Sequence, residues 1–219
     1  GLSPLYSLVF SKMNDFFTMG SDPIVFLLGS TLFARPVLLE TEFFDDKGGW
    51  VVEQQFMDQM GSPYVMAHGL GRPVQDAVHV IEAGELNGKF RLWVRTRDWV
   101  NPHGPGRFTV QGWSSVGNAR KKCFETRELG IGTGAWHWED CGIIDIPDAS
   151  VEIRLHDLTG FDGRCDAMMF VPSHELTKPS AEWNEWVFRK NLLGLPDEPT
   201  SVAFDFVVVG GGYAGMCAA

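Results

Sequence analysis

The chain lacks the features that mark several large classes of protein. No apolar run in its 219 residues reaches the roughly 20 residues that a bilayer-spanning helix needs. Lys and Arg number 18 against 28 Asp and Glu, which gives a formal net charge of −10. Neutralising nucleic-acid phosphates requires clustered basic residues. The sequence therefore predicts neither a transmembrane segment nor a nucleic-acid partner.

Cysteine is scarce and lacks regular spacing. The four cysteines form no C-x-x-C pair, so neither a zinc site nor a dithiol redox site is predicted. A disulfide among Cys123, Cys141 and Cys165 and a set of buried free thiols both remain open. The chain also lacks a G-x-S-x-G motif and any recognisable nucleophile–base arrangement, so the sequence assigns no catalytic residue.

Glycine, proline and tryptophan, in contrast, are plentiful, with 25, 12 and 8 residues. This composition favours many turns and an aromatic-rich β core. The clearest strand is GKFRLWVRTRDWV (88–100), in which Phe90, Leu92 and Val94 alternate with arginine and tryptophan. Further short apolar segments follow, each bounded by Gly, Pro or Asp. Residues 37–172 are therefore predicted to form an antiparallel β-sandwich or jelly roll.

The segments that flank this predicted sandwich have different patterns. Residues 1–36 are irregular, and the apolar stretch 23–34 has the length of a signal-peptide core with a poor charged flank. This stretch fits either a degenerate signal peptide or, alternatively, an ordinary buried segment or a mis-started reading frame. A signal peptide would make the protein secreted or periplasmic. Residues 173–202 are predicted to be a helical linker, capped by Ser180 and stopped by Gly194.

The last segment, 203–219, contains the run FDFVVVGGGYAGMCAA, a G-x-G-x-x-G motif directly after an apolar, strand-like stretch. Gly210 permits a tight turn, Gly212 lets a pyrophosphate approach the backbone, and Gly215 lets a helix pack on the strand. The N-terminus of that helix offers unpaired N–H groups to the anion. The motif predicts the first βα turn of a Rossmann-type domain, whose cofactor-binding loop comprises Gly210, Gly211, Gly212, Tyr213, Ala214 and Gly215.

The features that would confirm this motif are absent. The acidic residue that holds the ribose is expected about 20 residues beyond the glycines, and the printed sequence ends at Ala219. We therefore expect the chain to be the front part of a longer protein. The terminal segment resembles the flavin-binding start of FAD-dependent oxidoreductases. Upstream stretches such as WVRTRDWV, GAWHWEDCG and LHDLTGFDGRCDAMMF look like the N-terminal β-domain of a bacterial, often exported, group of them.

This resemblance covers about residues 38–219 and carries several implications. It implies FAD as the cofactor and a flavin domain of the same parent chain as the partner of the β-domain. Hydride transfer would then be performed by residues that the sequence does not contain.

Three acidic residues are candidates for a metal site. Glu40 and Glu42 lie two apart in LLETEFF, so on a strand their carboxylates share one face, and Asp166 in the closing strand is a third oxygen donor. This set is similar to the opening and closing strands that hold a structural calcium in many sandwich-type carbohydrate-binding modules, and hard oxygen ligands suit Ca²⁺. A solvated acidic edge strand is the alternative.

Trp93 is the best candidate for stacking on a sugar ring. It shares a predicted strand face with Arg91, Arg95 and Arg97, which is too charged to be the main core. The same face could instead pack on the flavin domain, and we prefer this interpretation. The main functional prediction is thus the N-terminal part of an FAD-dependent oxidoreductase. The alternatives are a calcium-stabilised sandwich that binds carbohydrate and a structural brace that binds no ligand.

Overall fold

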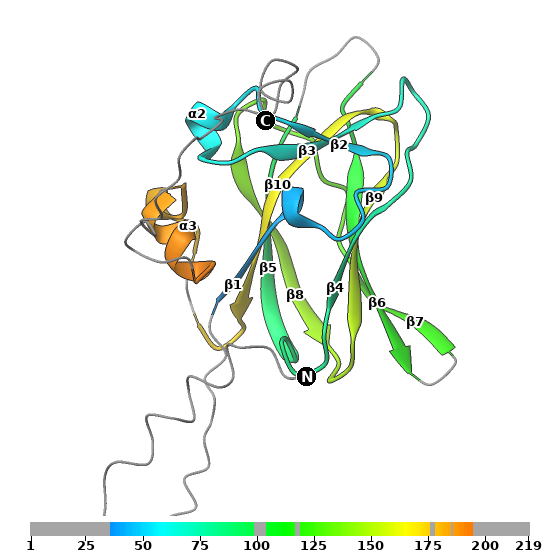
Figure 1. Cartoon of the computed structure of the whole chain (residues 1–219), viewed down its shortest axis with the longest axis vertical. Coiled ribbons are helices and arrows are strands. Elements are labelled where there is room, and N and C mark those ends of the chain that lie inside the picture. The colour runs from blue at the N-terminus through cyan, green and yellow to red at the C-terminus, as the bar shows by residue number, and fades with distance from the viewer. Residues whose placement is uncertain (1–35, 99–103, 117–118, 176–177, 185, 195–219) are drawn as a thin grey trace, which may run out of the picture. The chain divides into compact units, whose positions relative to one another are not determined.

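Two antiparallel β-sheets make up most of the computed structural model, which describes residues 36–98, 104–116, 119–175, 178–184 and 186–194 (Figure 1). Sheet A has the strand order β2-β3-β10-β5-β8, with β1 also paired to β10. Its strands are β1 (Val37–Glu40), β2 (Trp50–Glu53), β3 (Tyr64–His68), β5 (Gly88–Arg97), β8 (His137–Ile146) and β10 (Phe161–Pro172).

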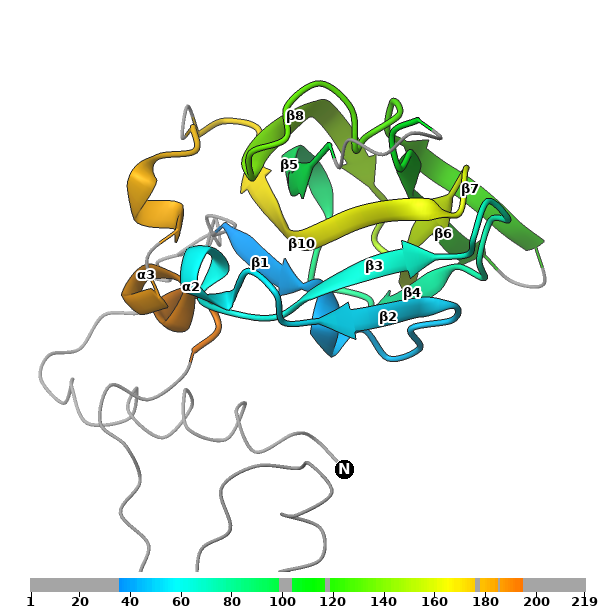
Figure 2. The ribbon, with the colours of Figure 1, turned by 90° about the horizontal axis from the view of Figure 1, so that it is seen from above.

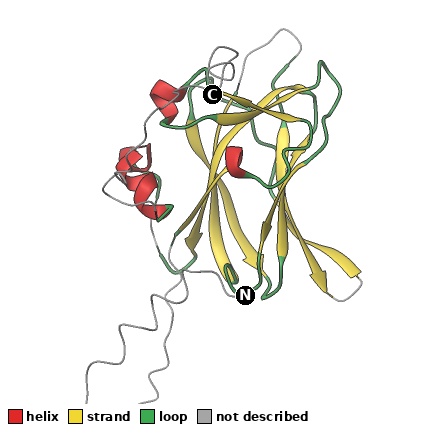
Figure 3. Cartoon of the chain, in the orientation of Figure 1, coloured by secondary structure: helices red, strands yellow, loops and turns green. Residues whose placement is uncertain are grey.

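Sheet B has the order β4-β9-β6-β7. Its strands are β4 (Ala77–Ile81), β6 (Phe108–Val116), β7 (Ala119–Glu125) and β9 (Val151–Asp157). Helices contribute little to the described residues (Figure 3): they are the 3₁₀ helices η1 (Thr41–Phe43) and η2 (Ala181–Asn184) and the α-helices α2 (Met57–Met60) and α3 (Trp186–Leu192). The predicted fold class, a mainly β antiparallel sandwich, is confirmed.

The main core lies between the two sheets and follows from the alternation of side chains along each strand. In β9, Val151, Ile153 and Leu155 are fully buried, while the residues between them are half-exposed. The predicted core positions Phe90, Leu92 and Val94 of β5 join the same cluster from sheet A. Burying each such side chain contributes about 1.5–3 kcal/mol, so the period-two pattern decides which face of each sheet turns inward.

Sheet A is also apolar on its outer face. Strand β10 is buried continuously from Gly163 onward, because its two faces contact two different clusters. The second cluster joins Trp93 and Met169 of sheet A to Trp183 of η2, and Phe188 of α3 packs against it. Figure 2 shows α3 beside β1, on the side of the molecule opposite β7. The segment predicted as a helical linker therefore packs on the sandwich.

The stretch LLETEFF is not one strand, as the sequence suggested. Strand β1 ends at Glu40, and the chain turns into η1 at Thr41. The buried Thr41 hydroxyl donates hydrogen bonds to the carbonyl oxygens of Cys165 and Asp166, both at 2.8 Å. These contacts hold the chain against β10 at the place where the register of β10 with β5 shifts. Glu42 consequently lies on a helical turn instead of a strand.

The connection between β9 and β10 is not a hairpin, because β9 belongs to sheet B and β10 to sheet A. The turn between them carries the chain from one sheet to the other. The buried carboxylate of Asp157 holds this turn by accepting hydrogen bonds from the backbone N–H groups of Val74, Thr159 and Gly160 at 2.9–3.1 Å. Gly160 has φ +67°, and a Cβ there would lie 2.2 Å from the Arg72 carbonyl oxygen.

Candidate functional site

The outer face of sheet B carries polar side chains that stand in register across neighbouring strands. Gln111 of β6 lies opposite Arg154 of β9 on one side and opposite Glu125 of β7 on the other. Trp113, which lies two residues further along β6 on the same face, is opposite Glu152 of β9 and Lys122 of β7. Side chains directly opposite one another in antiparallel strands are close enough to interact. The register therefore gathers residues from three strands on one surface.

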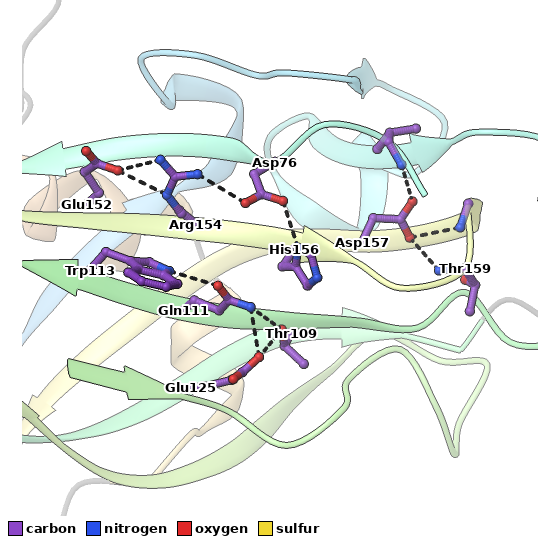
Figure 4. Close-up of polar contacts among 12 residues, drawn as sticks. Asp76, Thr109, Gln111, Trp113, Glu125, Glu152, Arg154, His156, Asp157 and Thr159 are labelled. Atoms are coloured by element: carbon purple, nitrogen blue, oxygen red, sulfur yellow. Dashed lines mark hydrogen bonds and ion pairs between the residues drawn. The ribbon is translucent and has the colours of Figure 1, made fainter. Parts of the chain in front are cut away.

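The first of two polar networks on this face centres on Gln111 (Figure 4). Its side-chain oxygen accepts a hydrogen bond from the Trp113 indole at 2.9 Å, and its amide donates to Glu125 at 2.8 Å. Thr109 and Lys122 donate to the same carboxylate at 3.2 and 2.6 Å. The hydrogen bond from Lys122 is the main cause that lowers the pKa of Glu125. The indole is thus fixed in orientation by a chain of hydrogen bonds.

The second network runs along β9 to the edge of the sheet. Arg154 donates to Glu152 at 2.6 and 3.1 Å and to Asp76 at 3.2 Å, and Asp76 also contacts His156 at 2.9 Å (Figure 4). Arg120 of β7 pairs with the same Glu152 carboxylate. The network borders a cleft of about 330 Å³, which is lined by Asp46, Gly48, Gln75, Asp76, Val78 and Arg154.

Trp113 is the aromatic residue of this face. Its ring is half-buried and is flanked by the Arg120 guanidinium and the Lys122 ammonium, at 5.3 and 5.1 Å from the ring centroid. Both distances are within the range of cation–π attraction. An aromatic plane beside a few fixed donors and acceptors is the usual composition of a small-molecule site. This face therefore has the means to bind a ligand that is both polar and flat.

A second hollow lies at one end of the sandwich, among the loops that join the strands. Its volume is about 540 Å³, and it is lined by Gly104, Pro105, Arg107, Glu128, Ile131, Thr159 and Phe161. Arg107 and Glu128 form an exposed ion pair across it at 2.9 Å. The aromatic contribution here is Phe161, which is half-buried. This hollow is a second location for a ligand, with fewer fixed polar groups than the face of sheet B.

Trp93, which the sequence singled out for sugar stacking, is not open to a ligand. Only 8% of the residue is exposed, and its ring packs edge-on against Trp183 of η2, with centroids 6.4 Å apart. The arginines of the same face are engaged as well: Arg91 pairs with Asp140 at 3.0 Å and Arg95 is buried beside Asp166. This face packs on the chain's own helical segment and not on a flavin domain.

The three candidate metal ligands do come together, but a guanidinium lies among them. Arg189 of α3 is fully buried and donates to both oxygens of Glu40, through Nε at 2.8 Å and through Nη2. Its Nη2 also lies 3.3 Å from the Asp166 carboxylate, which Arg95 contacts at 3.3 Å from the other side. A fully desolvated ion pair of this kind requires such matched hydrogen bonds.

These contacts leave little for a metal ion to bind. Calcium takes six to eight oxygen ligands, whereas both Glu40 oxygens and both Asp166 oxygens already have hydrogen-bond donors. In the part of the chain that the structure describes, no group of three His, Cys, Asp or Glu side chains has the geometry of a metal site. With Arg189 docked, Glu40, Glu42 and Asp166 as placed here do not fit a calcium ion.

Glu42 is the exception within this cluster. Its residue is 9% exposed, and its Oε2 atom has no hydrogen-bond partner. Burial is the main cause that raises the pKa of Glu42 to about 8, and the negative charge of Glu40 adds to the effect. Arg189 could not be predicted as a partner of Glu40, because it lies 149 residues from Glu40 in an ordinary basic run of a helix.

The remaining predictions concern the cysteines, membrane-spanning helices and the two terminal segments. Cys123, Cys141 and Cys165 are free thiols. Among the residues that the structure describes, no helix is long and apolar enough to cross a membrane. The predicted cofactor loop, Gly210 to Gly215, lies outside the described residues, as does the apolar stretch 23–34.

Comparison with known proteins gives structural likeness only. The chain matches no protein-family model and no curated protein. A family 35 carbohydrate-binding module from Clostridium thermocellum is 17% identical, with a TM-score of 0.45 over 64% of this chain and 100% of that one. The GH26-CBM35 β-(1,4)-mannanase of Podospora anserina is 16% identical, with a TM-score of 0.46 over 68% of this chain and 31% of that one.

A third similar structure is the CBM36-1 domain of a multidomain xylanase from the hindgut metagenome of Trinervitermes trinervoides. It is 13% identical, with a TM-score of 0.43 over 64% of this chain and 100% of that domain. At such identities the likeness concerns the fold alone.

The predicted resemblance to FAD-dependent oxidoreductases is wrong. The three structures described above are carbohydrate-binding modules or an enzyme that carries one, and none of the three is a flavin enzyme. The alternative, a sandwich like that of carbohydrate-binding modules, is the interpretation that the findings support.

Proposed function

We propose that the described domain is a carbohydrate-binding module that holds a glycan on the outer face of sheet B. The observation that carries this proposal is Trp113, whose indole is fixed by Gln111 beside two cations and next to the Arg154 network. A sugar ring offers one apolar C–H face and a rim of hydroxyls. An oriented indole with fixed donors and acceptors around it matches both parts.

The charges of this face favour a neutral glycan. Arg120, Lys122 and Arg154 are each paired with a carboxylate of the same face. A ligand with a full charge would have to break one of these pairs to be neutralised, whereas hydroxyl groups can join the existing hydrogen bonds as donors and acceptors. We therefore infer a neutral polysaccharide as the ligand class, and not a polyuronate.

The polar side chains on the outer face of sheet B suit ligand binding and not catalysis. The acidic groups of the face, Asp76, Glu125 and Glu152, are committed to ion pairs or hydrogen bonds. Their side chains are held as a polar platform, which orients a ligand but offers no free general acid. In a longer protein such a domain would bring the rest of its chain to a polysaccharide.

The test is binding of the full chain to soluble neutral polysaccharides, including mannan, xylan and β-glucan, by affinity electrophoresis and calorimetry. We expect Trp113→Ala to weaken binding about tenfold or more, since central aromatic residues dominate such sites. A matched control is Ile131→Ala, which removes an exposed apolar side chain from the loop-end hollow.

Two results would contradict the proposal. Absence of binding to every neutral glycan would remove the function altogether. Binding that survives Trp113→Ala but is lost in Ile131→Ala would transfer the site from sheet B to the loop-end hollow.

A further inference from the structure

A cleft of about 360 Å³ lies where η1 meets α2 and the C-terminal end of α3. Its lining is mainly apolar and includes Phe43, Pro63 and Leu193, and the carboxylates of Glu40 and Glu42 also border it. Phe43 stands at this cleft with 68% of its residue exposed. The site is separate from sheet B, so nothing about it depends on carbohydrate binding.

The acidic side of this cleft is short of positive charge. Three carboxylates, those of Glu40, Glu42 and Asp166, interact with only two buried guanidiniums, those of Arg95 and Arg189. The hydrogen bonds of both arginines go to Glu40, Asp166 and neighbouring oxygens. Among the described residues, Glu42 has no ion-pair partner, although it is nine-tenths buried and its Oε2 has no hydrogen-bond donor.

We propose that this cleft binds an organic cation, an ammonium group on an apolar stem, with Glu42 as its counter-ion. The apolar walls suit the stem, and the unpaired carboxylate suits the charged end. Buried carboxylates are normally paired or hydrogen-bonded, so an unpaired one beside a cavity indicates a missing partner. A free alkylamine has this chemistry.

The same geometry argues against two other ligands. A calcium ion needs several oxygen ligands, but Glu42 alone keeps a free carboxylate oxygen in this cluster. A purely apolar ligand would fill the walls and leave the carboxylate unsatisfied. An organic cation is the ligand that satisfies both the apolar wall and the acid.

Occupancy of the cleft is expected to depend on pH. Glu42 faces the charges of Glu40 from β1, Asp166 from β10 and Arg189 from α3, and burial raises its pKa to about 8. The carboxyl must lose its proton to pair with an ammonium group. Because an alkylammonium keeps its own proton below about pH 10, affinity should rise about tenfold per pH unit from pH 6 to 8 and then level off.

The experiment is calorimetric titration of the full chain at pH 8.5 with hexylammonium chloride and, separately, with 1-hexanol and calcium chloride. We expect hexylammonium to bind at least tenfold more tightly than hexanol. Glu42→Gln should remove this preference while retaining the shape of the side chain. Glu82→Gln, which removes an exposed carboxylate elsewhere, is the matched control and should change nothing.

A second variant tests the apolar wall without entering the buried cluster. Phe43→Ala removes an exposed ring, so it should leave folding intact and weaken hexylammonium and hexanol equally. Equal affinity for hexanol and hexylammonium in the wild type, or loss of binding to the same extent in Glu82→Gln and Glu42→Gln, would overturn the proposal. Calcium binding that depends on Glu42, without hexylammonium binding, would replace it with a metal site.

Discussion

Trp93 and Trp113 both lie within strand-like sequence, but Trp93 is buried in the structure and Trp113 is partly exposed. Each lies on the outward face of a long strand and within cation–π distance of an arginine, Arg91 or Arg120. The outer face of sheet A is covered by η2 and α3, so Trp93 becomes part of a second core. Trp113 on sheet B is half-exposed and is held by a hydrogen bond to Gln111. A tryptophan on the outer face of a sheet therefore belongs to the core where other elements cover that face, and is a candidate binding residue where they do not.

The largest effect is expected from Arg189, which links α3 to the covered face. Arg189→Gln removes the cation from between Glu40 and Asp166 and should lower the free energy of unfolding by about 3–5 kcal/mol, because a buried carboxylate is left uncompensated. Urea denaturation measures this change. Arg120→Gln is the matched control and should cost about 1 kcal/mol or less, since its ion pair is exposed. Equal costs for the two variants would show that α3 is not held by Arg189.

The two outer faces should respond differently to loss of an aromatic side chain. Trp183→Ala uncovers Trp93 and leaves a cavity, so the free energy of unfolding should fall by about 3 kcal/mol and tryptophan fluorescence should shift toward the red. Trp113→Ala should lower stability by about 1 kcal/mol or less and act on glycan binding instead. If Trp113→Ala destabilised the domain as strongly as Trp183→Ala, the distinction between the two faces would fail.

Stability should also fall with rising pH because of Glu42. Its folded-state pKa of about 8 exceeds the ordinary value of 4.5, so the folded state holds a proton that the unfolded state has lost. The resulting loss of stability between pH 6 and 8 is about 2 kcal/mol. Burial raises the pKa of Asp166 as well, to about 7, so Glu42→Gln should remove part of this dependence. Denaturation curves at several pH values test this, and a wild type that gains stability from pH 6 to 8 would contradict it.

The smallest effect is expected from calcium. Because donors already occupy the Glu40 and Asp166 oxygens, adding calcium or removing it with EDTA should leave the melting temperature of the wild type unchanged. Thermal denaturation in both conditions is the measurement. A rise in melting temperature with calcium would mean that the ion displaces Arg189 from the carboxylates.

Local pattern predicted much of the fold. The alternation in GKFRLWVRTRDWV placed Phe90, Leu92 and Val94 in the core, and the helical segment after Ser180 contains η2 and α3. The pattern failed where a contact with a segment far away in sequence decides the local structure. Thr41 ends β1 by bonding to carbonyls 124 and 125 residues away, so the strand predicted through Glu42 becomes a helical turn.

The candidate site was less predictable. Nothing in the sequence distinguishes Trp113 from Trp93, because the register that sets Gln111 between Arg154 and Glu125 depends on the pairing of three strands. The glycine motif led to a family resemblance that the comparisons contradict, and the predicted cofactor loop itself lies outside the described residues.

The local amino-acid pattern is enough to predict which residues turn inward, since a period of two in short strands bounded by turns has one stable burial pattern. Tertiary structure alone decided that an arginine of α3 neutralises carboxylates from two strands, and that one sheet face is covered while the other stays accessible. The physical reason is that ion pairing and coverage depend on which distant segments meet, whereas burial within a strand depends on neighbouring residues.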